Sequence, residues 1–295
     1  MAATAVVAPR VKSSYAPTNP ILDYLSSVDH KKIAKMYLWT TVLFFIVGGI
    51  LALLVRTQLA IPANSFLKPQ VYNQVFTMHG TTMIFLFVIP MWSGFGNYFV
   101  PLQIGARDMA FPRINAFSFW LIPFGAAVLF AGFFVPADVK THCLGGAGSA
   151  GWTGYVPLTE KQYACSLGQD FWILGLHILG VGSILGAINF LVTILNMRAP
   201  GMSLFRMPLF TWSILITNFL GALAAPFLAA VQMMLLFDRQ FGTTFFQPNH
   251  GGDVLIYQVI FWFYSHPAVY IMVLPAFGII SEVIPVFSKK PIFGY

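Results

Sequence analysis

Six long apolar stretches constrain this chain more than any other feature of its sequence. A stretch of roughly 20 apolar residues crosses the ~30 Å hydrocarbon core of a bilayer as an α-helix. Of the 295 residues, 58% are apolar and only 8% are charged, whereas an ordinary soluble domain carries about a quarter charged residues. The sequence therefore predicts an all-α, polytopic transmembrane helix bundle, with spans at approximately 37–59, 72–100, 114–135, 170–196, 209–237 and 253–286.

The basic residues predict the orientation of these spans. If the N-terminus lies inside, eleven of the 16 Lys and Arg residues fall in inner segments and five on the outer side. This excess follows the positive-inside rule and predicts an N-in, C-in topology. The net charge of +7 is then a mark of topology, and no nucleic-acid partner is expected.

Two regions follow from this topology. Residues 1–36 are expected to form a cytoplasmic N-terminal tail at the membrane surface, and residues 37–295 form the transmembrane domain. The tail holds no short apolar stretch that ends in a small-residue cleavage site, so no cleavable signal peptide is expected. The longest outer loop holds Cys143 and Cys165, and on that side a disulfide and two free thiols both remain open.

Three of the six histidines, His79, His177 and His266, lie within predicted spans. Ionisable residues inside a membrane are costly and usually functional. His79 is a candidate haem ligand, since neutral imidazole is a common axial ligand of haem iron, although a hydrogen bond to a carbonyl is an equally simple role. His177 lies among glycines that let helices approach closely, which favours a packed, hydrogen-bonded residue. His30 and His250 are expected to be solvated loop residues.

A histidine and a tyrosine share one face of the sixth span. His266 and Tyr270 are four residues apart, so their side chains lie one helical turn from each other. Arg56 lies near the outer end of the first span, and from its local sequence its side chain is expected to extend to the lipid headgroups.

A second group of polar residues points toward the inner surface. Asp108 lies in an inner loop, and several amides and hydroxyls recur on helices that lead away from it. Water inside a protein needs such polar partners, so the group predicts a hydrated path for protons. Its members are Asp108, Asn97, Asn115, Asn189, Ser118 and Ser183.

Together these segments closely resemble subunit I of the haem-copper oxidases, in particular of cytochrome c oxidase. The stretches that carry the resemblance are HGTTMIFLFVIP, WSGFGNYFVPLQIGARDMAFPRINAFSFW, GWTGYVPL, LGAINFLVTILNMR and WFYSHPAVY. The resemblance implies that the low-spin haem has His79 as an axial ligand and Arg56 at a peripheral substituent. It also implies that His266 binds the copper of the dioxygen-reducing centre and that Tyr270 is cross-linked to it.

The same resemblance implies a proton route and a subgroup. Asp108 and the asparagines match the mouth of the inner channel known as the D-pathway. The common family pattern has a glutamate two residues after the copper-ligand histidine, where this chain has Ala268. The chain is similar instead to the subgroup in which a Tyr-Ser pair, here Tyr264 and Ser265, replaces that glutamate. Tyr264 is one turn before Ala268 and so shares its helical face.

The implied activity is the reduction of dioxygen to water at a high-spin haem and copper, with electrons from cytochrome c and coupled proton pumping. A quinol oxidase or nitric oxide reductase of the same superfamily is the alternative. A cofactor-free transporter or assembly subunit is an alternative of another class. The implied location is a membrane, expected to be the bacterial plasma membrane.

The resemblance also implies further protein partners. Family members have about twelve helices, and the remaining half would carry the other ligands of both haems and of copper. We therefore expect this chain to act with the C-terminal half of subunit I or a chain that supplies it. The other expected partners are subunit II with its copper centre, subunit III, cytochrome c or another electron donor, and membrane lipid.

Overall fold

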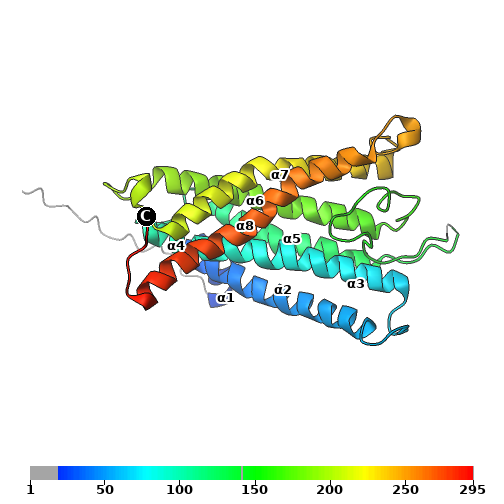
Figure 1. Ribbon diagram of the computed structural model, residues 1–295, viewed down its shortest axis with the longest axis horizontal. Coiled ribbons are helices and arrows are strands. Elements are labelled where there is room, and N and C mark those ends of the chain that lie inside the picture. The colour runs from blue at the N-terminus through cyan, green and yellow to red at the C-terminus, as the bar shows by residue number, and fades with distance from the viewer. Residues whose placement is uncertain (1–18, 141, 295) are drawn as a thin grey trace, which may run out of the picture.

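The computed structural model describes residues 19–140 and 142–294, and its long elements are all helices (Figure 1). Among the described residues, six helical segments are long and apolar enough to cross a membrane. They are His30–Gln58, Pro69–Ile104, Pro112–Phe134, Gly168–Asn196, Leu209–Phe241 and Val254–Ser288. The predicted all-α bundle of six spans is therefore confirmed. Arg10 and Lys12, which contribute to the charge count, lie outside the described residues.

The spans are built mainly from regular α-helices. The helices are α1 Pro20–Leu25, α2 His30–Gln58, α3 Pro69–Thr81, α4 Ile89–Ile104, α5 Pro112–Ala131, α6 Gly168–Asn196, α7 Leu209–Phe241 and α8 Val254–Ser288. The second span is composite, because the π-helix η1, Thr82–Val88, joins α3 to α4. Short 3₁₀ turns lie at η2 Gly132–Phe134, η3 Leu204–Arg206 and η4 Pro248–His250.

Capping residues extend the helices beyond the apolar segments. The first span begins at His30 rather than near residue 37, because the Asp29 carboxylate accepts hydrogen bonds from the backbone N–H groups of Lys31 and Lys32 at 2.9 and 3.0 Å. A carboxylate at this position satisfies N–H groups that the helix leaves free. At the other end of two helices, Gly105 and Gly242 adopt positive φ values of 76° and 69° and stop α4 and α7.

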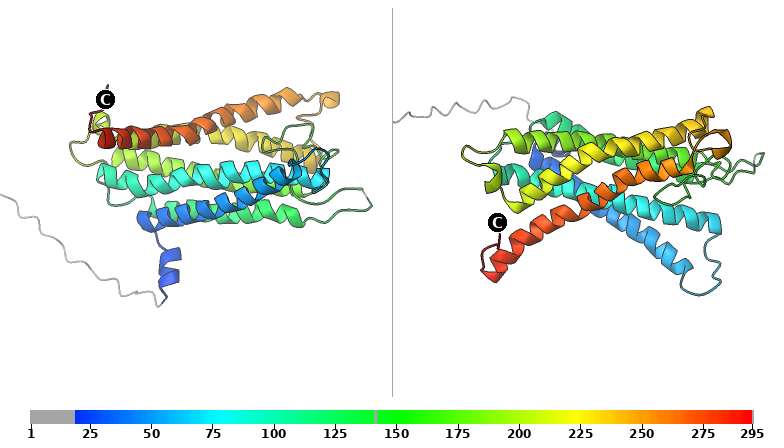
Figure 2. Two further views of the ribbon diagram at one scale, coloured as in Figure 1. Left: turned by 60° about the horizontal axis from the view of Figure 1, so that its bottom comes forward. Right: turned by 45° about the horizontal axis from the view of Figure 1, so that its top comes forward.

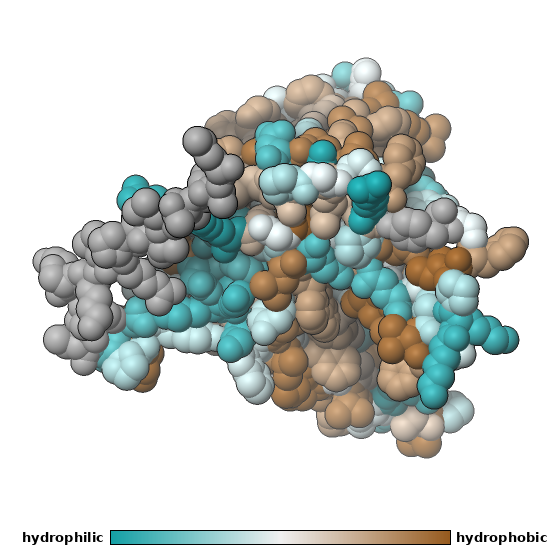
Figure 3. All heavy atoms as spheres, turned by 90° about the vertical axis from the view of Figure 1, so that its left-hand side faces the viewer, coloured by the Kyte–Doolittle hydropathy of each residue, from teal (hydrophilic) through white to brown (hydrophobic). Residues whose placement is uncertain are grey.

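The helices run side by side along the long axis of the molecule (Figure 1). Helix α6 packs against α5 and α7, and α2 packs against α3, η1 and α4. Helix α8 packs mainly on α7 and crosses the bundle obliquely (Figure 2). Because the number of described spans is even, α1 and the C-terminal residues lie at the same end of the bundle, together with the 105–111 loop. The sequence predicts this end to be the inner side. Hydrophilic side chains are spread across that end, with hydrophobic side chains between and behind them (Figure 3).

The outer loop between α5 and α6 is covalently closed. Cys143 and Cys165 form a disulfide with a Cα–Cα distance of 5.7 Å. The choice between a disulfide and free thiols, which the sequence left open, is thus decided in favour of the disulfide.

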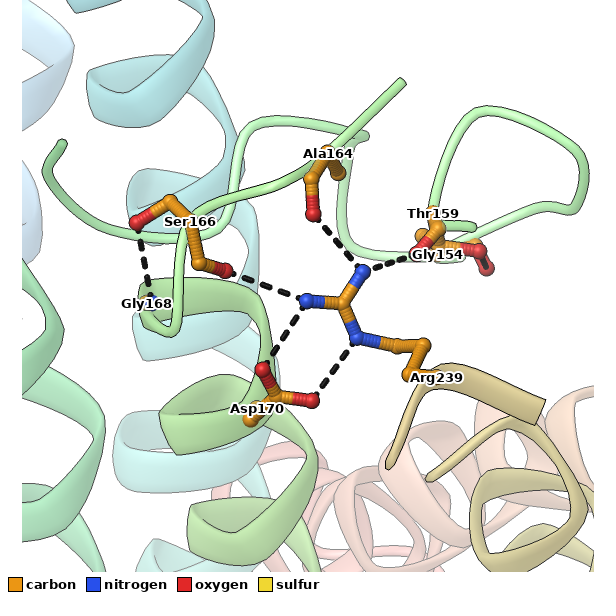
Figure 4. Close-up of polar contacts among 7 residues, drawn as sticks. All are labelled: Gly154, Thr159, Ala164, Ser166, Gly168, Asp170 and Arg239. Carbon is orange, nitrogen blue, oxygen red and sulfur yellow. Dashed lines mark hydrogen bonds and ion pairs between the residues drawn. The ribbon is translucent and has the colours of Figure 1, made fainter. Parts of the chain in front are cut away.

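A buried arginine connects this loop to two helices (Figure 4). Arg239 at the end of α7 is 3% exposed. Its Nε and Nη2 donate to the two oxygens of Asp170 in the first turn of α6 at 2.8 and 2.9 Å. Nη1 donates to the carbonyls of Thr159 and Ala164, and Nη2 also donates to that of Ser166. All five N–H groups of the guanidinium are used, so the loop, α6 and α7 share one charged centre.

We predict that Asp170→Asn strongly destabilises the protein. Removing one partner of a buried ion pair leaves an uncompensated charge and typically costs about 3–5 kcal/mol. The unfolding midpoint of the purified protein in detergent should fall clearly. Lys32→Gln, which breaks the exposed pair of Lys32 with Asp23, should leave the midpoint unchanged. An unchanged midpoint for Asp170→Asn would contradict the role of the pair.

Candidate functional site

His79 lies in the last turn of α3, directly before the π-helix η1. Its Nδ1 donates to the carbonyl oxygen of Gly48 on α2 at 2.9 Å. A carbonyl oxygen only accepts, so Nδ1 carries the proton and Nε2 keeps a free lone pair. A histidine that binds no metal would make this hydrogen bond. A histidine that binds a metal through one ring nitrogen also usually donates a hydrogen bond from the other. The residue therefore fits an axial ligand of haem iron.

The approach of α2 to His79 depends on Gly48. A Cβ atom at Gly48 would lie 2.6 Å from the sulfur of Met83 in η1. The glycine thus allows η1 and α2 to pack closely enough for the hydrogen bond to His79. π-helical turns are rare and often occur at functional sites. Arg56 lies exposed in the last turn of the same helix α2, and its contact with a haem substituent stays a prediction.

His266 and Tyr270 lie together on the exposed face of α8. Their ring centroids are 4.6 Å apart in an edge-to-face arrangement, and Tyr270 is 46% exposed. Within residues 19–140 and 142–294, no group of three His, Cys, Asp or Glu side chains is arranged to hold a metal. His266 can therefore supply one ligand, and the described part of the chain does not supply a complete copper site.

The buried face of the same helix holds the Tyr-Ser pair. Tyr264, Ser265 and Ala268 are all buried, so Tyr264 and Ala268 share one face. The Ser265 hydroxyl has no hydrogen-bond partner among the described residues. Helix α8 therefore separates a His-Tyr pair on one side from a Tyr-Ser pair on the other.

Tyr264 lines a cavity of about 130 Å³ between the helices. Its lining is mainly apolar, with some polar side chains that offer hydrogen-bond partners to water. Its polar lining residues come from α2, α4, α5, α6, α7 and α8, and they are Tyr37, Ser93, Ser118, His177, Ser183, Thr217, Asn218, Gln232 and Tyr264. Two of the predicted path residues, Ser118 and Ser183, are thus brought to the same space as Tyr264.

On the inner side, four residues form a polar cluster that leads toward this cavity. The Nδ1 of His30 donates to the carbonyl of Asn97 at 2.7 Å, and the Nδ2 of Asn115 donates to Oδ1 of Asn97 at 2.6 Å. Asp108 is half-buried close to His30. His30 is itself 2% exposed, so its assignment as a solvated loop residue was wrong. The helix begins earlier than expected and carries His30 into the bundle.

A buried tyrosine on α2, Tyr37, lines the cavity about two turns beyond His30. The hydroxyl groups of Tyr37 and Ser118 are 3.2 Å apart, and Ser118 donates to the carbonyl of Gly182 at 2.6 Å. Sequence reasoning missed both Tyr37 and His30. The signal was available, because the two are seven residues apart and so share one face of α2.

The other two residues of the predicted proton path, Asn189 and Ser183, form hydrogen bonds with backbone groups. Asn189 accepts from the N–H of Phe111 at 2.9 Å and donates to its carbonyl, so it anchors the loop that holds Asp108. Ser183 donates to the carbonyl of Leu179 at 3.1 Å. Asn189 therefore has a positioning contact in this structure, and its part in a proton route stays a prediction.

Two further histidines lie as expected. His177 has Nδ1 and Nε2 at 3.0 and 3.1 Å from the carbonyls of Ile173 and Ala229. It is therefore the packed, hydrogen-bonded residue that the sequence predicted. His250 is exposed in the outer loop η4.

The Asp108 carboxyl lies in an environment that favours its neutral form. Burial raises the pKa of Asp108 above its ordinary value of 3.8. The hydrogen bond from the Met109 N–H, at 2.7 Å, and the nearby His30 ring offset this only in part. A carboxyl group with a raised pKa at the inner surface is suited to take up and release protons.

Comparison with known proteins identifies the relatives of this chain. Residues 32–295 match the family described as Cytochrome C and Quinol oxidase polypeptide I. The chain is 51% identical over 280 residues to cytochrome c oxidase subunit 1 of Synechocystis sp., an alignment that covers 95% of this chain and 49% of that protein. It is 46% identical over 300 residues to cytochrome c oxidase subunit 1 of Corynebacterium efficiens, with 98% and 50% covered. The chain thus spans about half the length of these relatives.

We predict that the Asp108 carboxyl titrates above pH 3.8 in the folded protein. The folded state favours the protonated form, so the contribution of Asp108 to stability is present below the unfolded pKa and is lost as the pH rises through the folded pKa. The difference infrared spectrum between the parental protein and Asp108→Asn should contain a protonated carboxyl band that persists above that pH. A midpoint at or below 3.8 would contradict the prediction.

Proposed function

This chain belongs to the Cytochrome C and Quinol oxidase polypeptide I family, and on that premise we propose that it forms part of the catalytic subunit of a respiratory terminal oxidase. The complex reduces dioxygen to water with electrons from cytochrome c and pumps protons. The observation that carries the proposal is the two-sided helix α8. It presents His266 and Tyr270 on one face and Tyr264 to the cavity on the other.

His79 holds the low-spin haem in this proposal. The Gly48 carbonyl fixes the ring so that Nε2 is free to bind iron, and Arg56, near the end of α2, contacts a peripheral haem substituent. A hydrogen bond from Nδ1 also makes the ligand nitrogen more basic and orients the ring.

His266 holds copper, and Tyr270 assists the reaction of dioxygen. The edge contact of the two rings supports the cross-link that the family resemblance implies. When bound, the high-spin haem and copper supply the electrons and the dioxygen site. Tyr270 supplies a proton from a position one turn from His266. The Tyr-Ser subgroup assignment is part of this proposal.

Protons reach this centre along the polar residues of the inner half. They enter at Asp108, pass the cluster of His30, Asn97 and Asn115, and continue past Tyr37 and Ser118 into the cavity. Ser183 and Tyr264 line that cavity. Tyr264 and Ser265 then pass the proton across α8, and Asn189 keeps the entry loop in place.

The partners and the location follow from the family. The chain acts with the C-terminal half of subunit I, subunit II with its copper centre and subunit III, in the lipid of a bacterial plasma membrane. The family includes quinol oxidases, so cytochrome c as the electron donor is part of the proposal. Tyr270 next to His266 favours dioxygen reduction over nitric oxide reduction.

We predict that the two ligand histidines can be separated by substitution in the purified complex. His79→Leu should abolish the low-spin haem spectrum, because iron loses an axial ligand. His266→Ala should reduce copper content and dioxygen consumption while the low-spin spectrum remains. His177→Gln is the matched control, because His177 also lies within a candidate membrane span and has its ring nitrogens near backbone carbonyls.

Two outcomes would count against the proposal. A parental complex that is colourless and free of copper would favour a transporter or assembly subunit. Normal copper in His266→Ala, or a normal six-coordinate spectrum in His79→Leu, would remove that residue from the ligand set.

We predict that Tyr264→Phe slows proton uptake during single-turnover oxidation by dioxygen by about tenfold or more, as expected when a proton relay is removed. The substitution deletes only a hydroxyl group, so the haem spectra should be normal. Adding Ala268→Glu should restore part of the rate, because residue 268 shares the buried face of α8 with Tyr264. Uptake at the parental rate would make Tyr264 a packing residue.

A further inference from the structure

Gln232 occupies a distinctive position in the wall of the cavity. It is the cavity-lining residue of α7 nearest to the outer end of that helix. From Asn218 to Gln232 the lining extends roughly 20 Å along α7, at a rise of about 1.5 Å per residue. Gln232 is 1% exposed, and its Oε1 has no hydrogen-bond partner among the described residues.

A short hydrogen-bonded chain leads from Gln232 to the outer loop. The Nε2 of Gln232 donates to the hydroxyl of Tyr257 at 2.9 Å, and that hydroxyl donates to the carbonyl of Thr153 at 2.9 Å. Tyr257 lies in the first turn of α8, and Thr153 lies in the loop that Arg239 and the disulfide hold in place. From its geometry alone, this chain of hydrogen bonds resembles a proton route from the cavity to the outer surface.

The groups in the chain hold their positions but do not conduct protons. A link in a proton relay must accept a proton on one side and release another on the other side. The amide nitrogen of Gln232 only donates, so Gln232 cannot pass a proton on to Tyr257. The Tyr257 hydroxyl can both accept and donate a proton, so the step that fails to conduct lies at the amide of Gln232.

Aromatic rings exclude water around the same chain. The ring of Tyr257 contacts Phe246, Phe261 and Tyr155 at centroid distances of 5.5, 5.9 and 6.2 Å. Phe246, Tyr257 and Phe261 are fully or almost fully buried. We call these four residues the outer aromatic layer. It leaves the amide of Gln232 as the polar group at the boundary between this layer and the cavity.

We propose that Gln232 is a proton block, a positioning residue that closes the outer end of the hydrated cavity against proton return from the outside. This inference rests on the proposed function, in which protons fill the cavity from the inner side. Gln232 lines the cavity, its Oε1 is buried without a hydrogen-bond partner among the described residues, and its Nε2 anchors the outer aromatic layer through Tyr257. An amide at this position cannot take up and release a proton, so the outer wall of the cavity does not conduct there.

The test replaces Gln232 by residues that conduct or do not conduct protons. Gln232→Glu keeps the size but adds a titratable group, and Gln232→Leu keeps a non-conducting side chain. The purified complex is reconstituted in liposomes without electron donor, and passive proton flux is driven by a potassium diffusion potential with valinomycin. Gln232→Glu should raise the flux roughly tenfold or more, whereas Gln232→Leu should match the parental complex.

Other outcomes decide against the block. Equal flux in Gln232→Glu and the parental complex would overturn it, and so would equally raised flux in Gln232→Leu, which would indicate a packing defect. If Gln232→Leu loses pumping at normal turnover, the chain is an outward route instead. Gln232→Ser, which adds a hydroxyl and room for water, should also leak and serves if the glutamate variant does not assemble.

The flux measurement is independent of the proposed oxidase function. It requires no haem, no electron donor and no turnover, so it can succeed even when the parental complex proves colourless. Failure of the oxidase proposal would be seen in the absorption spectrum, and failure of the block would be seen only in the flux. During turnover, Gln232→Glu should also lower the protons pumped per electron while leaving the haem spectra unchanged.

Discussion

In the hydrocarbon core of a membrane, every polar group must find its partner inside the protein, and the rest of this structure depends on that constraint. The helices satisfy their own backbones, and the few polar side chains within them form groups: Asn97 with Asn115, Tyr37 with Ser118, and Gln232 with Tyr257. Among the described residues, the buried atoms without a hydrogen-bond partner include Gln232 Oε1 and Thr217 Oγ1, whose side chains line the cavity, and Ser265 Oγ on α8.

Helix α8 shows how one helix serves two kinds of chemistry. With 3.6 residues per turn, neighbouring residues point in different directions, so Ser265 is buried while His266 next to it is exposed. A ligand for a metal and a hydroxyl for a proton are thus adjacent in the sequence but lie on different sides of the helix. Under the proposed function, this arrangement would bring the proton route close to the metal centre and keep that centre apart from the cavity.

Much of this could be predicted from the sequence, because bilayer thickness sets the length of apolar segments and helical spacing sets which residues share a face. The six spans and the packing of His177 followed from these rules. The burial of His30 did not, since its charged neighbours are typical of a membrane surface and its partner Asn97 is 67 residues away. The disulfide could not be decided from two loop cysteines alone. Gln232 is one amide in an apolar helix, and only its contacts distinguish it from a packing residue.

The buried pair of Asp170 and Arg239 has a consequence for how the protein is made. The two residues are 69 positions apart, in the first turn of α6 and the last turn of α7, and they meet at the open end of the hairpin that these helices form. While the chain is being synthesised, Asp170 must wait for an entire helix to follow before its counter-charge emerges. Insertion of α6 by itself therefore leaves a carboxylate without its ligand at the outer edge of the membrane. The favourable unit of insertion is the pair of helices, and the outer loop can take its final form only after the second has crossed.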